Sequence, residues 1–397
     1  MTPKWNRRRL LLTGLGAGLA TGSTVDRLRE RRRAARQLAD DSLSQYTSAV
    51  EAAYASEASW QEEVEQLLST SEPELPPPPI PYDRERSLQL IRACKLAVTQ
   101  YRTGRSVPSF DGDLTDLDDF RRSFPGYEHV ATFVATEENL ERYLQADPAP
   151  PPGTLHSPLG DGLQFLRRAL HETIPAIVRR AYRLPVYFGF VLRSDRDQLM
   201  VFRGTQTQAE WVSNIRSGQR RYPADPAEPQ LGWVHNGFLT IAGTQLRPNP
   251  AELADEVLDP ALPLYITGHS LGGALATISA LDLAHRVPEL AGQIRLYTYA
   301  APRVGDPSFA ESFRRLVPNA YRVANVADTV PLVPSTKMGR GFVHVGEPWT
   351  FLAHFGDLLP NHIADTYLAA VSRKAEGPGR HRGLHTLEGL PTADSGD

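Results

Sequence analysis

Cysteine is almost absent from this chain, since Cys94 is the single one among 397 residues. No disulfide can therefore form within the chain, and a zinc site built from several cysteines is excluded. Cys94 lies in the apolar-periodic run at 88–94, where we expect a buried structural thiol. The N-terminal region also lacks a long apolar run: the stretch at 10–20 covers 11 residues, whereas a membrane-spanning helix needs about 20.

Acidic residues outnumber basic residues over most of the chain. The formal net charge is −3, yet residues 1–36 carry ten Lys or Arg side chains against two acids, a net +8, which leaves −11 for the remainder. Nucleic-acid phosphates are bound by basic surfaces, so this acidic body argues against a nucleic-acid partner. Apolar residues at 41% and charged residues at 22% are ordinary for a globular protein with a sizeable core.

The basic N-terminus resembles an export signal. Arg7, Arg8 and Arg9 precede a short Gly-rich apolar stretch, which is typical of a twin-arginine signal over residues 1–22. Export by that route predicts a location outside the cytoplasm. Six further arginines between positions 27 and 36 oppose translocation, so a basic anchor on the cytoplasmic face of a membrane stays open as the alternative.

The rest of the chain divides into four parts. Residues 23–72 predict a long helical segment, because Gly and Pro are missing from 25–70 and apolar positions step by three and four. Residues 73–81 predict a Pro-rich linker, residues 82–375 the main domain, and residues 376–397 a disordered tail. The chemistry of residues 105–160 cannot be inferred from their sequence, and we expect a solvated acidic loop rather than a calcium site at 111–119.

Short apolar strands alternate with helices from residue 185 onward. The expected strands are 186–192, 198–202, 264–267, 294–299 and 320–324, and a helix follows the third strand through residue 286. This alternation predicts an α/β fold with a mostly parallel central sheet that is covered by helices on both faces.

The sequence GHSLGG at 268–273 lies between a predicted strand and a predicted helix, which is the context that a nucleophile elbow requires. The turn is sharp, so the residues that flank Ser270 must be small, and Gly268 and Gly272 meet that need. Ser270 then lies at a helix N-terminus, where backbone N–H groups and the helix dipole favour negative charge. These features predict that Ser270 is a catalytic nucleophile.

Residues 185–370 resemble the class 3 lipases, the family of the fungal triacylglycerol lipases. The segments that carry the resemblance are VFRGT at 201–205, EWVSN at 210–214, VHNGF at 234–238, GHSLGGALA at 268–276, YAAPRVG at 299–305 and NVADTVP at 325–331. The resemblance covers just under half of the chain. It implies an α/β-hydrolase fold, here preceded by the long N-terminal helix.

An acid is needed to orient the base that activates a serine nucleophile, and in α/β-hydrolases the chain order is Ser, acid, His. Asp328 follows the last predicted strand and is suitably placed to be this acid. The resemblance assigns the acid to the same position. Asp306 is the alternative, but its Gly-Asp-Pro setting is typical of a turn.

The base is chosen among three histidines downstream of the acid. The resemblance assigns it to His362, which precedes the last predicted helix, and His344 and His354 are the alternatives. His269 is expected to pack beside the nucleophile, and His235 to support the structure near the site.

Negative charge develops on the carbonyl oxygen during acyl transfer, and backbone N–H donors form the oxyanion hole that stabilises it. Leu271 follows the nucleophile and should supply one donor. The resemblance assigns the second to Thr205 and places a lid directly after it, with a fixed surface helix as the alternative. The lid residues are Gln206, Ala209, Trp211, Val212 and Ile215.

Taken with the resemblance, these residues predict a serine esterase or lipase that hydrolyses acylglycerols, phospholipids or galactolipids with neither a metal nor an organic cofactor. Contact with a membrane or lipid-droplet surface is expected. Another serine hydrolase, such as a thioesterase or peptidase, and a non-catalytic membrane-associated scaffold stay open. The sequence does not indicate an oligomeric state.

Overall fold

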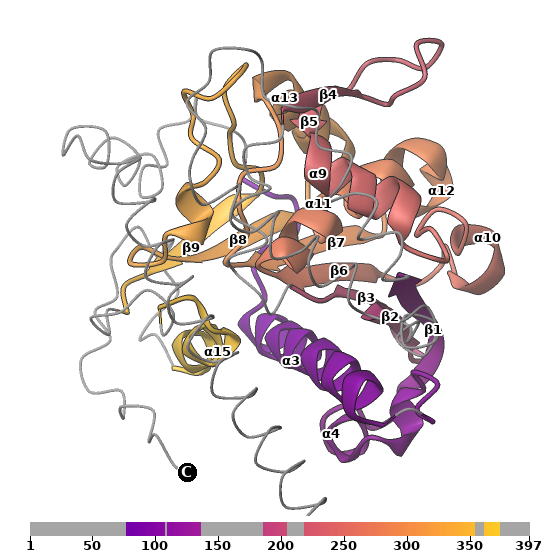
Figure 1. Cartoon of the computed structure of the whole chain (residues 1–397). Helices are drawn as coiled ribbons and strands as arrows, with labels where there is room; N and C mark the ends of the chain where they lie inside the picture. The colour runs from indigo at the N-terminus through magenta and orange to yellow at the C-terminus, as the bar shows by residue number, and fades with distance from the viewer. Residues whose placement is uncertain (1–76, 108, 136–185, 205–217, 354–360, 374–397) are drawn as a thin grey trace, which may run out of the picture. The chain divides into compact units, whose positions relative to one another are not determined.

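Seven strands form the central sheet of this computed structural model (Figure 1), which describes residues 77–107, 109–135, 186–204, 218–353 and 361–373. In their order across the sheet the strands are β1 (Glu128–Ala135), β2 (Val186–Arg193), β3 (Gln198–Phe202), β6 (Leu264–His269), β7 (Ile294–Tyr299), β8 (Ala320–Asn325) and β9 (Glu347–Phe351). β3, β6, β7, β8 and β9 pair in parallel, whereas β1 and β2 extend the sheet by antiparallel pairing. The predicted mostly parallel sheet is confirmed.

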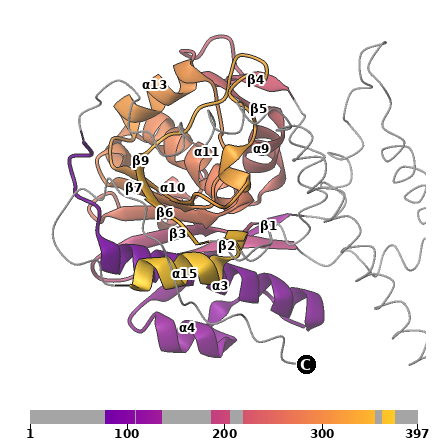
Figure 2. The same cartoon turned by 90° about the vertical axis from the view of Figure 1, so that its left-hand side faces the viewer.

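Helices cover both faces of this sheet (Figures 1 and 2). α3 (Arg84–Ser106) and α15 (Ala364–Ser372) pack on one face, and α11 (Leu271–Arg286) packs on the other. The shorter elements are α4 (Asp118–Ser123), α9 (Asn236–Thr240), α10 (Ala254–Val257), α12 (Pro288–Ala291), α13 (Pro307–Leu316), a two-stranded sheet of β4 (Gln219–Tyr222) and β5 (Gly232–His235), 3₁₀ turns at Leu114–Asp116 and Val330–Leu332, and a π turn at Ile241–Gln245. The arrangement confirms the predicted α/β fold with helices on both faces of the sheet.

The two edge strands were not predicted from the sequence. β1 and β9 are mostly half-buried rather than buried, so they lack the continuous apolar run that marks the inner strands. β9 also contains Pro348, which has no N–H to donate and is therefore tolerated at a sheet edge. The predicted inner strands at 198–202 and 294–299 coincide with β3 and β7.

A large apolar core lies between α3 and the sheet. Leu90, Ile91, Cys94 and Ala97 recur at helical spacing on α3 and are buried against the sheet. The Cys94 Sγ lies 3.6 Å from the Thr267 Oγ1, and burial raises the pKa of the Cys94 thiol to about 12. The prediction of a buried structural thiol is confirmed.

The residues just before α3 contact β8, the residue that precedes β8, and β9. The Ile80 N–H donates to the Asn319 side chain at 3.0 Å, and the Tyr321 hydroxyl donates to the Ile80 carbonyl. The Tyr82 ring stacks on Trp349 with centroids 5.8 Å apart. Part of the expected linker at 73–81 is therefore attached to the sheet.

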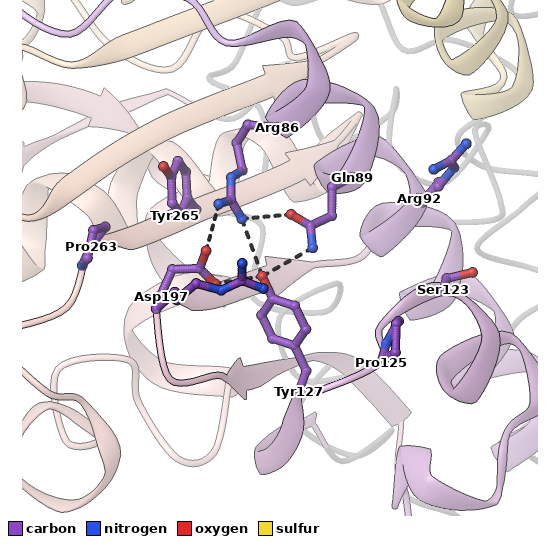
Figure 3. A pocket seen from close by; sticks show the side chains of 10 residues that line it. Arg86, Gln89, Arg92, Ser123, Pro125, Tyr127, Asp197, Pro263 and Tyr265 are labelled. Atoms are coloured by element: carbon purple, nitrogen blue, oxygen red, sulfur yellow. Dashed lines mark hydrogen bonds and ion pairs between the residues drawn. The ribbon is translucent and has the colours of Figure 1, made fainter.

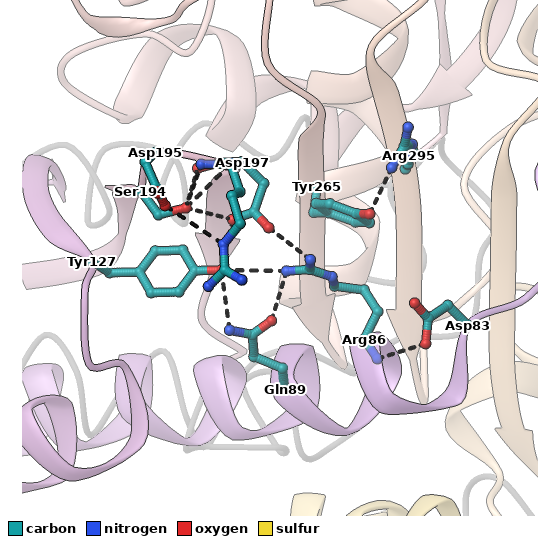
Figure 4. Close-up of polar contacts among 10 residues, drawn as sticks. Asp83, Arg86, Gln89, Tyr127, Ser194, Asp195, Asp197, Tyr265 and Arg295 are labelled. Carbon is teal, nitrogen blue, oxygen red and sulfur yellow. Dashed lines mark hydrogen bonds and ion pairs between the residues drawn. The ribbon is translucent and has the colours of Figure 1, made fainter.

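A polar cluster joins the first turns of α3 to the starts of β3 and β6 (Figures 3 and 4). Arg86 pairs with Asp197 at 2.6 Å and stacks over the Tyr265 ring, with Cζ 4.2 Å from the ring centroid. The Tyr127 hydroxyl donates to the same carboxylate at 2.6 Å. Because a buried carboxylate without partners is costly, these contacts explain how Asp197 is tolerated beside a cavity of about 460 Å³. The cluster lies at the starts of β3 and β6, whereas Ser270 follows the opposite end of β6.

Several predictions concern residues outside the described ranges. They are the signal at 1–22, the long helix at 23–72, the tail at 376–397, the oxyanion residue Thr205 and the lid that follows it, and His354. Among the helices within the described ranges, none combines the length and apolar character needed to cross a bilayer.

Candidate active site

Ser270 occupies a sharp turn between β6 and α11. Its backbone has φ 59° and ψ −129°, a conformation with positive φ that residues other than Gly seldom adopt. A Cβ on Gly268 would overlap the Gly272 carbonyl, and a Cβ on Gly272 would overlap the Phe202 carbonyl. Both flanking positions therefore require Gly, and the strand–turn–helix geometry of a nucleophile elbow is present.

Three side chains from distant parts of the chain meet at this turn. The His362 Nε2 lies 2.9 Å from the Ser270 Oγ, and the His362 Nδ1 lies 2.8 Å from the Asp328 Oδ2. All three residues are at most 6% exposed. Because a carboxylate only accepts, Nδ1–H donates to Asp328 and leaves Nε2 free to accept the serine proton.

Asp328 is held by two groups besides the histidine. It follows β8, and its Oδ1 accepts from the Val330 N–H at 3.0 Å. The Tyr367 hydroxyl, from α15, donates to its Oδ2 at 2.7 Å. Sequence analysis missed Tyr367, although a tyrosine in an apolar helix just after the predicted base signals a buried hydroxyl that needs a partner.

The main chain around His362 is fixed from both sides. The Asn325 side-chain amide donates to the Asn361 carbonyl at 3.0 Å, and the His269 Nε2 lies 2.7 Å from the His362 carbonyl oxygen. Burial, followed by repulsion from His362, lowers the pKa of His269 to about 3. His269 is therefore neutral near pH 7 and donates its Nε2–H, a role beyond the packing that we predicted for it.

The residues at 199–338 match the model of the family described as Lipase (class 3). Over these residues the chain is similar to the class 3 lipases. A lipase of Rhizomucor miehei is 35% identical over 166 residues, which are 41% of this chain and 44% of that protein. A chloroplast and mitochondrial phospholipase A1 of Oryza sativa subsp. indica is 32% identical over 185 residues, 42% of each protein. The chain thus spans less than half the length of these curated relatives.

The solved structure of the triacylglyceride lipase of Rhizomucor miehei is also similar to this chain. It is 23% identical, with a TM-score of 0.45, and the match covers 68% of this chain and 81% of that one.

The exit of β3 passes directly beside Ser270. A Cβ on Gly204 would lie 2.8 Å from the His269 carbonyl oxygen and 3.1 Å from the Ser270 Cβ. Leu271, on the other side, is the first residue of α11. Gly204, the residue before Thr205, therefore lies beside Ser270.

Arg203 is a second residue that sequence analysis missed. Its guanidinium is buried, donates to the Tyr187 and Gly204 carbonyls at 3.0 and 2.6 Å, and lies over the Tyr101 ring. Burial lowers its pKa to about 10, so it remains a cation near neutral pH. Arg203 fixes the backbone that leads out of β3. The sequence signal that could have revealed this residue was an arginine within the VFRGT motif at 201–205.

The alternative acid and base, Asp306 and His344, have other partners. Asp306 caps α13, since its Oδ1 accepts from the Phe309 and Trp233 N–H groups at 2.9 and 3.0 Å. The His344 Nε2 bonds the Pro331 carbonyl at 2.7 Å, and burial lowers the pKa of His344 well below its usual range. His235 packs on the Phe238 ring with centroids 4.2 Å apart. Local structural contacts thus account for Asp306, His344 and His235.

Proposed function

We propose that this protein is a lipase that hydrolyses carboxylic ester bonds of lipids with Ser270 as nucleophile, His362 as base and Asp328 as the orienting acid. The observation that carries the proposal is the hydrogen-bonded series from the Ser270 Oγ through both His362 nitrogens to Asp328, with steps of 2.9 and 2.8 Å. It begins at an elbow whose flanking glycines admit no Cβ. Similarity to a lipase and a phospholipase A1 supports lipid esters as the substrate class.

The reaction proceeds in two halves. His362 Nε2 takes the Ser270 proton while Oγ attacks the ester carbonyl, and the imidazolium then protonates the leaving alcohol as the C–O bond breaks. A water molecule next gives its proton to His362 and attacks the acyl-serine. The fatty acid leaves, and the proton returns to the Ser270 Oγ.

The oxyanion of both tetrahedral intermediates is proposed to bind between Leu271 and Thr205. Leu271 contributes its backbone N–H at the start of α11. The close approach of Gly204 to Ser270 supports Thr205 as the second donor. One such donor is worth about 2.7–4 kcal/mol of transition-state stabilisation.

The segment after Thr205 is proposed to be a lid, with Trp211, Val212 and Ile215 forming its apolar side. It covers Ser270 in water and opens at a lipid surface. Activity measured across the critical aggregation concentration of a short-chain ester should rise sharply. A smooth hyperbolic dependence would contradict a moving lid and favour a fixed helix.

The test of the function begins with a fluorophosphonate, which reacts with activated serines. The full chain should be labelled at Ser270, and S270A should not be labelled. Mixed acylglycerols, phospholipids and galactolipids are then offered together, and released fatty acids are identified by mass spectrometry. Absence of labelling would contradict the proposed function. Cleavage of thioesters or peptides instead of lipid esters would assign the protein to another class of serine hydrolase.

The N-terminus is proposed to direct the enzyme to its lipid, as a twin-arginine signal over residues 1–22 followed by a basic segment that contacts membranes or lipid droplets. Replacing Arg8 and Arg9 by Lys should block export of the full chain. Pelleting with anionic liposomes, with and without residues 1–70, tests the contact. Absence of export of the unaltered chain, together with pelleting that needs residues 1–70, would favour the cytoplasmic anchor.

A further inference from the structure

The Tyr367 hydroxyl contacts the same carboxylate oxygen that orients the base. The Asp328 Oδ2 accepts from the His362 Nδ1 at 2.8 Å and from the Tyr367 hydroxyl at 2.7 Å. The Oδ1 of the same carboxylate accepts from the Val330 N–H instead. Tyrosine and histidine therefore share one acceptor atom.

The direction of the Tyr367 proton is fixed by a second hydrogen bond. The Asn325 N–H donates to the phenol oxygen at 3.1 Å, so the phenol proton is left to point at Asp328. Tyr367 is fully buried, and burial together with the Asp328 charge raises its pKa well above the usual range. The phenol therefore stays protonated at every pH at which an esterase works.

We propose that Tyr367 is a positioning residue that lowers the basicity of the Asp328–His362 pair by donating to the Oδ2 oxygen that His362 uses. The proposal rests on the proposed function. A carboxylate oxygen that accepts a second hydrogen bond has its negative charge stabilised, so it attracts an imidazolium less strongly. Tyr367 thus extends the neutral, proton-accepting form of His362 to lower pH.

Other charged and titratable groups around the pair differ in kind from Tyr367. His269, from β6, has its ring centroid 4.9 Å from that of His362 and is neutral near pH 7. Arg322, from β8, acts on Tyr367 electrostatically and lowers the pKa of its phenol. On the α3 side of α15, Asp365 is exposed and pairs with Lys95. None of these groups changes when the Tyr367 hydroxyl alone is removed.

The test compares Tyr367→Phe with the unaltered protein in the pH dependence of kcat/KM on a soluble short-chain p-nitrophenyl ester. Its acid limb, which reports protonation of the free enzyme's base, should move about 0.5–1 pH unit to higher pH. The plateau at high pH should stay within about tenfold of the original, since the triad itself is retained.

Tyr222→Phe is the matched control. Tyr222 is a buried tyrosine whose hydroxyl donates to Asp282 on α11, so the substitution removes a hydrogen bond of the same chemistry away from the triad. Both variants should lose a few degrees of Tm, about 2–4 °C. Only Tyr367→Phe should shift the acid limb, which separates tuning of the base from general destabilisation.

A variant with 3-fluorotyrosine at position 367 tests the same idea without removing the contact. This phenol is more acidic, donates more strongly and has nearly the same shape, so the acid limb should move to lower pH. The proposal is overturned by acid limbs that coincide with the original in both variants, or by an equal shift in Tyr222→Phe. Failure of the proposed function is a separate result, because the unaltered protein would then resist fluorophosphonate.

Discussion

The His269 Nε2 lies 2.7 Å from the carbonyl oxygen of His362, so one histidine holds the main chain of the other. His269 is the residue before the nucleophile, and His362 is 92 positions after Ser270. The bond therefore couples the elbow to the segment that supplies the base. This relationship leads to the first two predictions.

Replacing His269 by Leu should lower both activity and stability. The His362 carbonyl would be left buried without this donor, which costs about 1–3 kcal/mol of unfolding free energy. His269→Gln supplies an amide donor and should recover part of the loss in kcat/KM. Kinetics and urea unfolding of both variants check this, and equal activity in the two would show that the donor is irrelevant.

Stability should fall on acidification because of His269. The pKa of His269 is about 3 in the folded protein and 6.5 in the unfolded chain. Below pH 6.5 the unfolded chain therefore binds a proton that the folded protein does not bind. Each pH unit between these values removes about 1.4 kcal/mol of stability. His344, whose pKa is also lowered by burial, adds to the loss. Urea unfolding at several pH values should give a shallower acid dependence for His269→Gln, and an unchanged slope would contradict the assignment.

Asp328→Asn should reduce kcat by about 10⁴ while the fold is kept, because the amide disfavours the His362 tautomer that accepts the serine proton. Asp306→Ala is the matched comparison. It removes the α13 cap and should cost about 1–2 kcal/mol of stability with little change in kcat. Kinetics on a p-nitrophenyl ester and thermal unfolding measure both, and the reverse ranking in kcat would return the acid to Asp306.

Ser270→Ala should lower kcat by about 10⁶ because it removes the nucleophile. Ser279→Ala is the control on the same helix, since its buried hydroxyl has no hydrogen-bond partner in the part of the chain that the structure describes. It should leave kcat unchanged. Ester hydrolysis by purified proteins decides, and substantial turnover by Ser270→Ala rules out Ser270 as the nucleophile.

Gly272→Ala should damage the fold around the elbow. The added Cβ meets the backbone carbonyl of Phe202, which cannot move without shifting β3, so a loss of about 1–3 kcal/mol or more is expected. Gly292→Ala introduces the same methyl group where no atom lies within 4 Å and should change stability by less than about 0.5 kcal/mol. Thermal unfolding compares them, and equal Tm values would refute the steric argument.

Local pattern was sufficient for the parts of the fold whose sequence context is strong. The elbow required small residues on both sides of Ser270 between a strand and a helix, and these were visible in the sequence. The inner strands are buried over almost their whole length because both faces of the sheet are covered. The edge strand β1 has one partner and mixed burial, so its pattern is weak.

The supporting residues were beyond sequence reasoning. The roles of Tyr367 and His269 depend on hydrogen bonds to residues 39 and 93 positions away, and no periodicity encodes such pairs. Arg203 is an arginine at the end of an apolar strand, and its partners became evident when Tyr187, Gly204 and Tyr101 were seen around it. His362 itself was chosen over His344 by resemblance.

The sequence by itself determined the elbow around Ser270, because that geometry depends on neighbouring residues whose size and order are local properties. Only the tertiary structure decided which carboxylate meets which histidine, and which groups hold them. Hydrogen bonds act over about 3 Å, whereas the residues that form them are separated by dozens of positions, so their convergence is a property of the packed sheet and its helices.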